Sequence, residues 1–142
     1  MNITGIAGFA TITQDPAASR ALYKDTLALP LKVKDDYLHM DGFTGANHFG
    51  IWPLHRAAES CFGTATWPSD IPVPQATIEY ELNDIASVHA AVREMQANGQ
   101  HFVHEARTEP WGQTLARFIS PEGLLIGLSF APWLHQDNAK ST

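Results

Sequence analysis

The chain has 142 residues, 44% of them hydrophobic, so it can build one sizeable core or two half-size modules that depend on each other. Nine Lys and Arg residues against fifteen Asp and Glu residues give a net charge of −6, and the scattered basic residues argue against nucleic-acid or membrane partners. The single cysteine, Cys61, excludes an internal disulfide, and the start of the sequence lacks a signal-peptide pattern. We therefore expect a cytoplasmic protein.

The first half of the sequence predicts a strand, a helix and three further strands. A β-favouring stretch over Ile3–Thr13 ends at Asp15-Pro16, where an N-cap carboxylate followed by proline is a strong helix-start signal. The helix is expected to run from Pro16 to about Leu27. The three extended segments that follow are Leu31–Lys34, Tyr37–Met40 and His48–Leu54.

The second half repeats this order. Asp84 is a second N-cap, and apolar residues at helical spacing predict a helix that ends at Asn98-Gly99. The predicted strands are Thr77–Leu82, His101–His104, Thr114–Ser120 and Leu124–Phe130, the last two joined by a tight turn. Because Asp15 and Asp84 occupy equivalent places, the sequence predicts a duplicated βαβββ unit.

The duplication divides the chain into parts of one structural domain. We expect a first module over residues 1–54, a connector over residues 55–72, a second module over residues 73–133 and a tail over residues 134–142. The connector has no clear period beyond one helical turn near Arg56–Ser60, and connectors of this length often form lids or dimer arms.

The duplicated unit and three short motifs resemble the vicinal oxygen chelate superfamily, which comprises glyoxalases, bleomycin-resistance proteins and extradiol dioxygenases. The motifs are the segment Asp25–Leu31, the loop Glu109–Gly112 and the turn Ser120–Leu124. The loop is most similar to the bleomycin-resistance branch. The resemblance covers about residues 3–132 and implies an α+β fold, in which tandem modules form a curled mixed sheet with helices on its outer face and a ligand cavity on its concave face.

The resemblance also implies where a metal would be held. The enzymes of the superfamily bind a divalent metal through the first and last strand of each module, and these places fall on Gly8, Gly50, Thr77 and Gly127. Glycine has no side chain and a threonine hydroxyl is a poor ligand, so we expect no metal and no other cofactor there. We also expect the three glycines to leave open volume for an organic ligand.

Strand alternation predicts the other residues of the concave face. His48, Gly50 and Trp52 share that face in the first half, as do Thr77, Glu79 and Glu81 in the second, whereas Ile6, Gly8 and Ala10 share it on the first strand. Aromatic and acidic side chains suit a planar or cationic molecule. The predicted ligand-binding residues are Gly8, His48, Gly50, Trp52, Thr77, Glu79, Trp111, Arg117 and Gly127.

Several of these residues have a structural alternative. A strand glycine can mark a bulge, and Trp52 can pack in a dimer. Arg117 lies in an apolar strand and is either a clamp for a ligand carboxylate or a structural partner of Glu79. Trp67 and Trp133 are expected to be structural or interfacial.

His48 and Glu79 are the candidate catalytic residues, because each could act as an acid or base on the concave face. Together they could also form a two-ligand metal site, although the spacing does not show that they meet. His101 and His104 are expected to point to opposite faces of a strand. The remaining histidines are interpreted as surface residues: His39, His55, His89 and His135.

The sequence therefore predicts a homodimeric, metal-free binding protein that sequesters an aromatic or cationic small molecule. The alternative is a glyoxalase-like lyase or isomerase, or another enzyme of the superfamily, that uses His48, Glu79 or a displaced divalent metal. A third interpretation is a structural or regulatory dimer whose cavity is filled by its own side chains.

Overall fold

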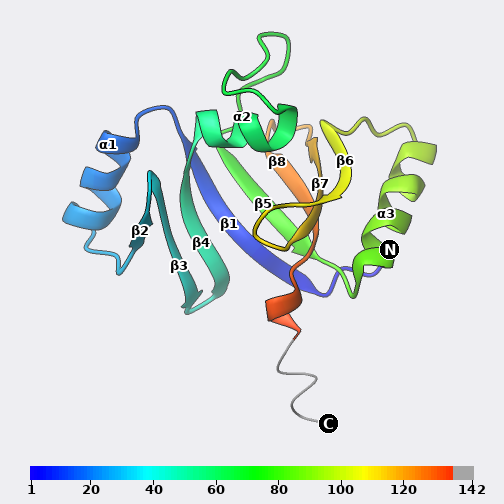
Figure 1. The fold of residues 1–142 in the computed structure, drawn as a ribbon, viewed down its shortest axis with the longest axis horizontal. Coiled ribbons are helices and arrows are strands. Elements are labelled where there is room, and N and C mark those ends of the chain that lie inside the picture. The colour runs from blue at the N-terminus through cyan, green and yellow to red at the C-terminus, as the bar shows by residue number, and fades with distance from the viewer. Residues whose placement is uncertain (136–142) are drawn as a thin grey trace.

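A computed structural model describes residues 1–135, which form one curled eight-stranded sheet with helices packed against it (Figure 1). The strands are β1 (Gly5–Thr13), β2 (Lys32–Lys34), β3 (Tyr37–Phe43), β4 (Ala46–Pro53), β5 (Ala76–Glu81), β6 (His104–Thr108), β7 (Thr114–Ile119) and β8 (Leu125–Phe130). The α-helices are α1 (Pro16–Arg20), α2 (Leu54–Phe62) and α3 (Ile85–Ala97). A π-helical turn over Ala21–Thr26 extends α1, and a 3-10 turn spans Pro132–Leu134.

The two modules join edge to edge within the chain. The strand order is β2-β3-β4-β1-β5-β8-β7-β6, and the antiparallel pair of β1 and β5 forms the centre of the sheet. In each module the first and last strands are parallel neighbours, namely β1 with β4 and β5 with β8. The predicted α+β fold of tandem βαβββ modules in a curled mixed sheet is confirmed, and the sheet does not close into a barrel.

Both predicted helix starts are confirmed by their caps. The Asp15 carboxylate accepts from the backbone N–H of Ala18 at 3.1 Å, and the Asp84 carboxylate accepts from that of Ser87 at 2.7 Å. Each aspartate thus satisfies one of the N–H groups that a helix start leaves unpaired.

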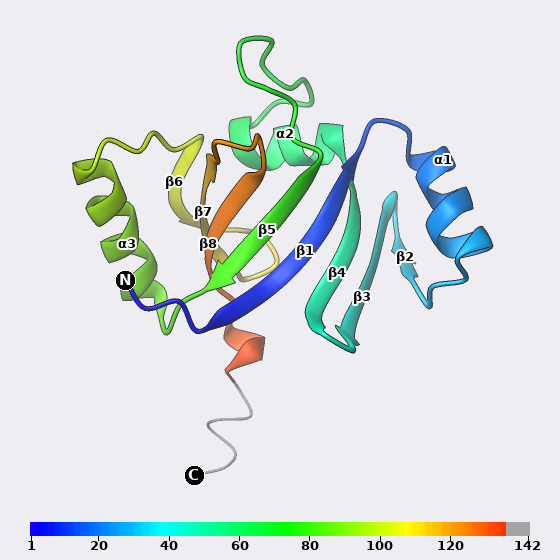
Figure 2. The ribbon, with the colours of Figure 1, turned by 180° about the vertical axis from the view of Figure 1, so that it is seen from behind.

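The outer face of the sheet carries two apolar clusters. In the first module, Leu38, Met40 and Ile51 pack with Tyr23 and other residues of the α1 side. In the second module, α3 packs against the outward side chains of β7 and β8, which include Phe118, Ile126 and Leu128. The predicted placement of helices on the outer face is therefore confirmed for α1 and α3, which lie at opposite flanks of the sheet (Figure 2).

The third helix, α2, lies on the other side of the sheet. Its buried residues Ala57 and Cys61 pack against Ile12 and Leu125, and Trp52 packs beside them. It lies in front of the upper ends of β1 and β5 in Figure 1 and behind them in Figure 2. The single turn expected near Arg56–Ser60 is thus a full helix that covers one end of the concave face.

Two details of the strand predictions are wrong. Residues 101–103 are not a strand: the ladder with β7 starts at His104 and is irregular before Arg107, and the preceding residues contribute a single bond, from the Val103 N–H to the Arg117 carbonyl at 2.8 Å. On β1, a bulge between Ile6 and Gly8 breaks the alternation, so Ile6 pairs with outward-facing Tyr80 while Gly8 pairs with Glu79. Ile6 therefore does not share the concave face with Gly8.

Candidate functional site

The places that resemble the superfamily's metal positions are occupied by neighbouring side chains. A Cβ atom on Gly50 would overlap the hydroxyl oxygen of Tyr37 and lie 2.8 Å from two of its ring carbons. A Cβ on Gly127 would lie 3.1 Å from Cγ of Glu79, and one on Gly8 would lie 3.3 Å from Cβ of His48. The predicted open volume over these glycines is therefore wrong, because the glycines admit close approach of other side chains.

The donor set at these positions does not fit a metal. Thr77 supplies the single side-chain oxygen, and this buried Oγ1 has no hydrogen-bond partner in the described part of the chain. One neutral hydroxyl cannot replace the imidazole and carboxylate ligands that divalent metals require.

The side chains that face the concavity beside Gly50 form a stack of three rings: Tyr37 and His39 of β3 and His48 of β4. The Tyr37 and His39 ring centroids are 5.2 Å apart with an interplanar angle of 11°, and the His39 and His48 centroids are 5.9 Å apart. Residues two apart on β3 share a face, and His48 pairs with Asp41 across the ladder. The antiparallel pairing of β3 and β4 thus builds the ring stack.

Hydrogen bonds fix the orientation of His48. Its Nδ1 lies 2.6 Å from a carboxylate oxygen of Asp41, and its Nε2 lies 2.5 Å from the hydroxyl oxygen of Tyr37. With Asp41 accepting from Nδ1–H, the Nε2 lone pair accepts from the Tyr37 hydroxyl. The arrangement is a continuous chain from a carboxylate through an imidazole to a phenol, the order in which such groups move a proton.

Burial sets the charge of two rings in the stack. The pKa of Tyr37 is raised, first by burial and then by the negative charges of Glu79 and Asp41, so the hydroxyl keeps its proton. The pKa of His39 is lowered, first by burial and then by His48. Both rings are therefore neutral at neutral pH, and the exposed carboxylate of Asp41 supplies the negative charge at this end of the face.

Arg117, a predicted ligand-binding residue, lies at the centre of a buried polar cluster. Its side chain is 1% exposed, and its guanidinium nitrogens lie 3.3 Å from a Glu109 oxygen and 3.6 Å from a Glu79 oxygen. It also donates to Ser60 Oγ at 3.0 Å, and it lies 5.3 Å from the ring centroid of Trp52. These contacts correspond to the structural alternative, a partner of Glu79, rather than to an exposed clamp.

Glu79 and Glu81 face the concave side as predicted, and both accept hydrogen bonds from within the protein. Gln113 donates to Glu79 at 3.0 Å. Glu81 is buried and accepts from Ser129 Oγ at 2.8 Å and from the backbone N–H of Ala131 at 2.7 Å. Within residues 1–135, His48 and Glu79 share no hydrogen bond, so the structure does not bring this predicted pair together.

The four tryptophans differ in their surroundings. Trp52 is half-buried between α2 and Arg117, and Trp67 is buried with its Nε1–H donating to backbone carbonyls of the connector. Trp111 is 49% exposed and donates to the Gln113 side chain at 2.8 Å, and Trp133 is 43% exposed. Trp52 and Trp111 are therefore the tryptophans connected to residues of the concave face.

The sequence analysis missed Tyr37, His39 and Asp41. It interpreted His39 as a surface residue, whereas its side chain is 20% exposed and stacked within the concave face. His135, also interpreted as a surface residue, lies 2.7 Å from a Glu81 oxygen. The signal that could have found the β3 residues is the alternation of Tyr37, His39 and Asp41 with buried Leu38 and Met40.

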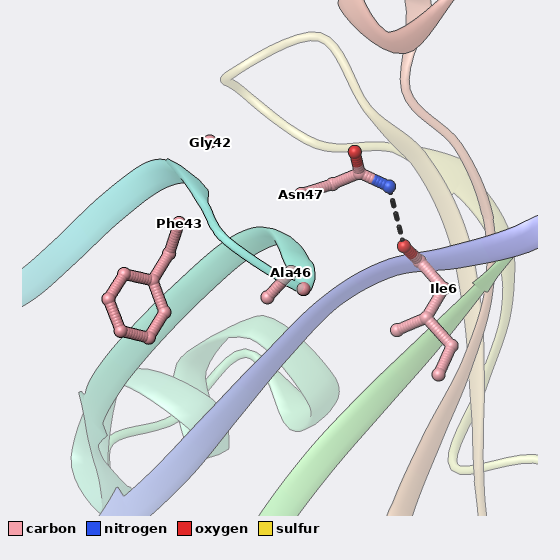
Figure 3. Close-up of a pocket in the computed structure, with 6 residues that line it drawn as sticks. Ile6, Gly42, Phe43, Ala46 and Asn47 are labelled. Carbon is pink, nitrogen blue, oxygen red and sulfur yellow. Dashed lines mark hydrogen bonds between the residues drawn. The ribbon is translucent and has the colours of Figure 1, made fainter.

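A shallow hollow lies apart from these residues, at the tip of the β3–β4 hairpin (Figure 3). The Asn47 side-chain amide donates to the Ile6 carbonyl at 2.8 Å across it. Its lining residues are Ile6, Gly42, Phe43, Gly45, Ala46 and Asn47. It contains no predicted site residue and no ionisable side chain.

Protonation of His104, beside Arg117, makes the stability of the folded protein depend on pH. Burial lowers the pKa of His104 to about 4, and the charges of Arg117 and Arg107 act in the same direction. Since the unfolded chain has an ordinary pKa near 6.5, it binds more protons than the folded protein between these values, and stability is lost as the pH falls through this window.

We expect His104→Gln to flatten this dependence. Between pH 7 and pH 4, the free energy of unfolding of the wild type should fall by about 1–2 kcal/mol more than that of the variant. The partial exposure of the ring keeps the effect this small. Urea unfolding at a series of pH values measures the difference. His101→Gln, at an exposed position, is the control, and equal pH profiles for wild type and His104→Gln would contradict the assignment.

The Glyoxalase/Bleomycin resistance protein/Dioxygenase superfamily model matches residues 5–128. The chain belongs to this superfamily. Its members typically bind small molecules and often form dimers. No curated protein matches the chain in sequence.

Solved structures with the same fold include a protein described as NAD-dependent benzaldehyde dehydrogenase from Legionella pneumophila (TM-score 0.58, 13% identity, covering 86% of this chain and 96% of that one). A superfamily member from Vibrio splendidus has a TM-score of 0.53 and 14% identity, with coverages of 85% and 94%. Methylmalonyl-CoA epimerase from Streptomyces coelicolor, in complex with 2-nitronate-propionyl-CoA, has a TM-score of 0.55 and 16% identity, with coverages of 92% and 99%. At these identities the likeness establishes the fold alone.

Within the part of the chain that the structure describes, none of the helices has the length and apolar character needed to cross a membrane.

Proposed function

We propose that this protein binds an aromatic or cationic organic molecule on the concave face of its sheet, without a metal at the superfamily's usual positions. The observation that carries the proposal is the ring stack of Tyr37, His39 and His48 beside the exposed Asp41 carboxylate. Flat, partly exposed rings next to a negative charge favour a planar cation through stacking and electrostatic attraction.

The other predicted binding residues have different parts in this proposal. Trp52 and Trp111 offer ring surface, whereas Glu79 adds negative charge from beneath. Gly8, Gly50 and Gly127 allow side chains of the concave face to approach the backbone closely, and Thr77 is a buried residue of the same face. Arg117 holds Glu79 and Trp52 in place rather than contacting the ligand. The ligand thus lies on the side chains that cover Gly8, Gly50 and Gly127 on the concave face.

Homodimerisation and a cytoplasmic location are further parts of the proposal. The single thiol, Cys61, is buried on the inner side of α2, and burial raises the pKa of this thiol, so it is poorly suited to form a disulfide. This supports a protein adapted to a reducing compartment.

Sedimentation equilibrium measures the oligomeric state, and a strictly monomeric protein would contradict the dimer.

Calorimetry against a panel of planar cationic antibiotics, with EDTA present, tests ligand binding. We expect at least one compound to bind with micromolar affinity and Trp52→Ala to weaken this binding at least about tenfold, since stacked aromatic contacts contribute on the order of 1 kcal/mol or more. Trp133→Ala is the matched control and should leave binding unchanged. The absence of heat for the whole panel, or equal affinities for both variants, would contradict the proposal.

A second candidate function is proton transfer at a carbon acid, of the lyase or isomerase type. The chain from Asp41 through His48 to the Tyr37 hydroxyl favours it, because Nε2 of the imidazole, oriented by the carboxylate, can take the hydroxyl proton of Tyr37 as the Tyr37 oxygen takes the substrate proton. One protein of the same fold is an epimerase, methylmalonyl-CoA epimerase from Streptomyces coelicolor. Deuterium uptake from solvent into α-protons of acyl thioesters, lost in His48→Gln, is the measurement that separates this function from binding alone.

A further inference from the structure

Two histidines and one aspartate of the β3–β4 ladder bring metal-binding atoms together at a place that the superfamily pattern does not use. His39 and Asp41 lie on the same face of β3, and His48 is the cross-strand partner of Asp41. One ligand atom from each residue lies within 4.8 Å of the others. Donors around a tetrahedral Zn²⁺ are about 3–3.5 Å apart, so small rotations of the exposed Asp41 carboxylate and the two rings would close the set.

The chemistry of this set suits a divalent transition metal. Two imidazoles and one carboxylate are the ligands that Zn²⁺, Ni²⁺, Co²⁺ and Fe²⁺ prefer, whereas Mg²⁺ and Ca²⁺ require mostly oxygen. The backbone of the β3–β4 ladder holds all three ligands, so the site requires no movement of a loop. We propose that His39, Asp41 and His48 bind one divalent transition-metal ion.

The hydrogen bonding around the set is compatible with such an ion. Among residues 1–135, buried His39 Nδ1 has no hydrogen-bond partner, and it lies 3.9 Å from an Asp41 oxygen. His48 Nδ1 lies 2.6 Å from the other Asp41 oxygen. The carboxylate therefore lies near both ring nitrogens, and an ion bound among the three groups would give His39 Nδ1 a partner.

Tyr37 supplies the outer support that metal-binding histidines usually have. When Nδ1 of His48 binds the ion, the proton resides on Nε2, which then donates to the Tyr37 hydroxyl oxygen 2.5 Å away. The Tyr37 ring also stacks on His39 and limits its rotation. One residue thus orients both imidazole ligands.

The location of the site distinguishes it from the superfamily's usual positions. Gly50 pairs with His39 across the ladder, so the site is adjacent to one place that has no ligand of its own. The Asp41 side chain is 62% exposed, which leaves an approach from solvent and coordination positions open for water or an organic oxygen. The metal site shares Asp41 and the two imidazoles with the face proposed to bind an organic molecule, so titration with the metal alone, in the absence of any organic compound, tests the metal site separately.

Isothermal titration of EDTA-stripped, dialysed protein with ZnCl2 alone tests the inference. We expect one ion per chain with micromolar or tighter affinity. Asp41→Asn and His39→Ala should each weaken binding at least about tenfold, and Tyr37→Phe should weaken it about tenfold through the loss of the outer hydrogen bond. Asp41→Asn changes an exposed side chain with little change of shape, so it keeps the test valid if a histidine variant fails to fold.

The matched control is His55→Ala. His55 and Asp36 form another histidine–carboxylate pair, 2.9 Å apart and partly exposed, but with two ligands rather than three. This variant should bind zinc as the wild type does, and bound Co²⁺ should give visible absorption bands that disappear in Asp41→Asn. The absence of zinc binding, unchanged affinity in both Asp41→Asn and His39→Ala, or loss of binding in His55→Ala would overturn the inference.

Discussion

Replacing Arg117 by methionine is expected to lower the free energy of unfolding by about 3–5 kcal/mol, the usual cost of removing one partner from a buried ion pair. Methionine keeps most of the side-chain volume, so the loss reports the charge rather than a cavity. The variant leaves the buried Glu109 carboxylate and the largely buried Glu79 carboxylate without their shared guanidinium. Urea unfolding followed by tryptophan fluorescence measures the change.

Arg107→Ala is the control for this experiment. Arg107 also pairs with Glu109, at 3.3 Å, but its side chain is 41% exposed, and its loss should cost less than about 1 kcal/mol. Glu109→Gln added to Arg117→Met should recover part of the stability, because it removes one of the uncompensated charges. A loss below about 1 kcal/mol for Arg117→Met would contradict the central role of this cluster.

The fold could be predicted from the sequence because its signals are local. The Asp15-Pro16 and Asp84 caps fix where the helices begin, and period-two alternation assigns the faces of β4, β5 and β8. The errors arose where pairing overrides local preference. The bulge before Gly8 arises in the pairing of β1 with β5, and the start of β6 depends on its pairing with β7. The local sequence of β1 or β6 alone therefore does not indicate either feature.

The contents of the concave face were harder to predict than its position. Alternation placed Gly50 and Thr77 there, but whether the space above a glycine is open depends on side chains from neighbouring strands. Tyr37 belongs to β3, and only the register of β3 with β4 shows that its ring covers Gly50. The Asp41 and His48 pair has the same origin, so a pattern read along one strand could not reveal the ring stack.

At two of the positions that correspond to the superfamily's metal sites, the concave face is filled by the protein's own side chains. The third sequence-based interpretation, a cavity filled by the protein's own side chains, describes the positions of Gly50 and Gly127, where Tyr37 and Glu79 lie. The solvent-facing surface next to these positions carries the half-exposed imidazole of His48 and the exposed carboxylate of Asp41. Loss of the usual ligand positions and the appearance of the ring stack are therefore two consequences of one packing arrangement.

Gly50→Val is the most direct test of that packing, and we expect it to lower the free energy of unfolding by about 2–3 kcal/mol. In a strand, a β-branched residue is normally more favourable than glycine. A net loss of stability must therefore come from overlap with the Tyr37 ring, two of whose carbons lie 2.8 Å from the added Cβ. Gly5→Val is the control, because no atom of the residues that the structure describes lies within 4 Å of a Cβ at that β1 position, and it should be neutral or slightly stabilising.

The double variant with Tyr37→Ala identifies the cause of the loss. If the ring is what the valine meets, Gly50→Val should cost less than half as much in the Tyr37→Ala background, which a double-mutant cycle measures as a coupling of at least about 1 kcal/mol. The displaced ring must also leave Nε2 of His48, so the imidazole NMR signals of His48 should shift in Gly50→Val. Additive costs with unchanged His48 signals would mean that Tyr37 does not cover Gly50 in solution, and both the ring stack and the functions proposed for it would lose their structural basis.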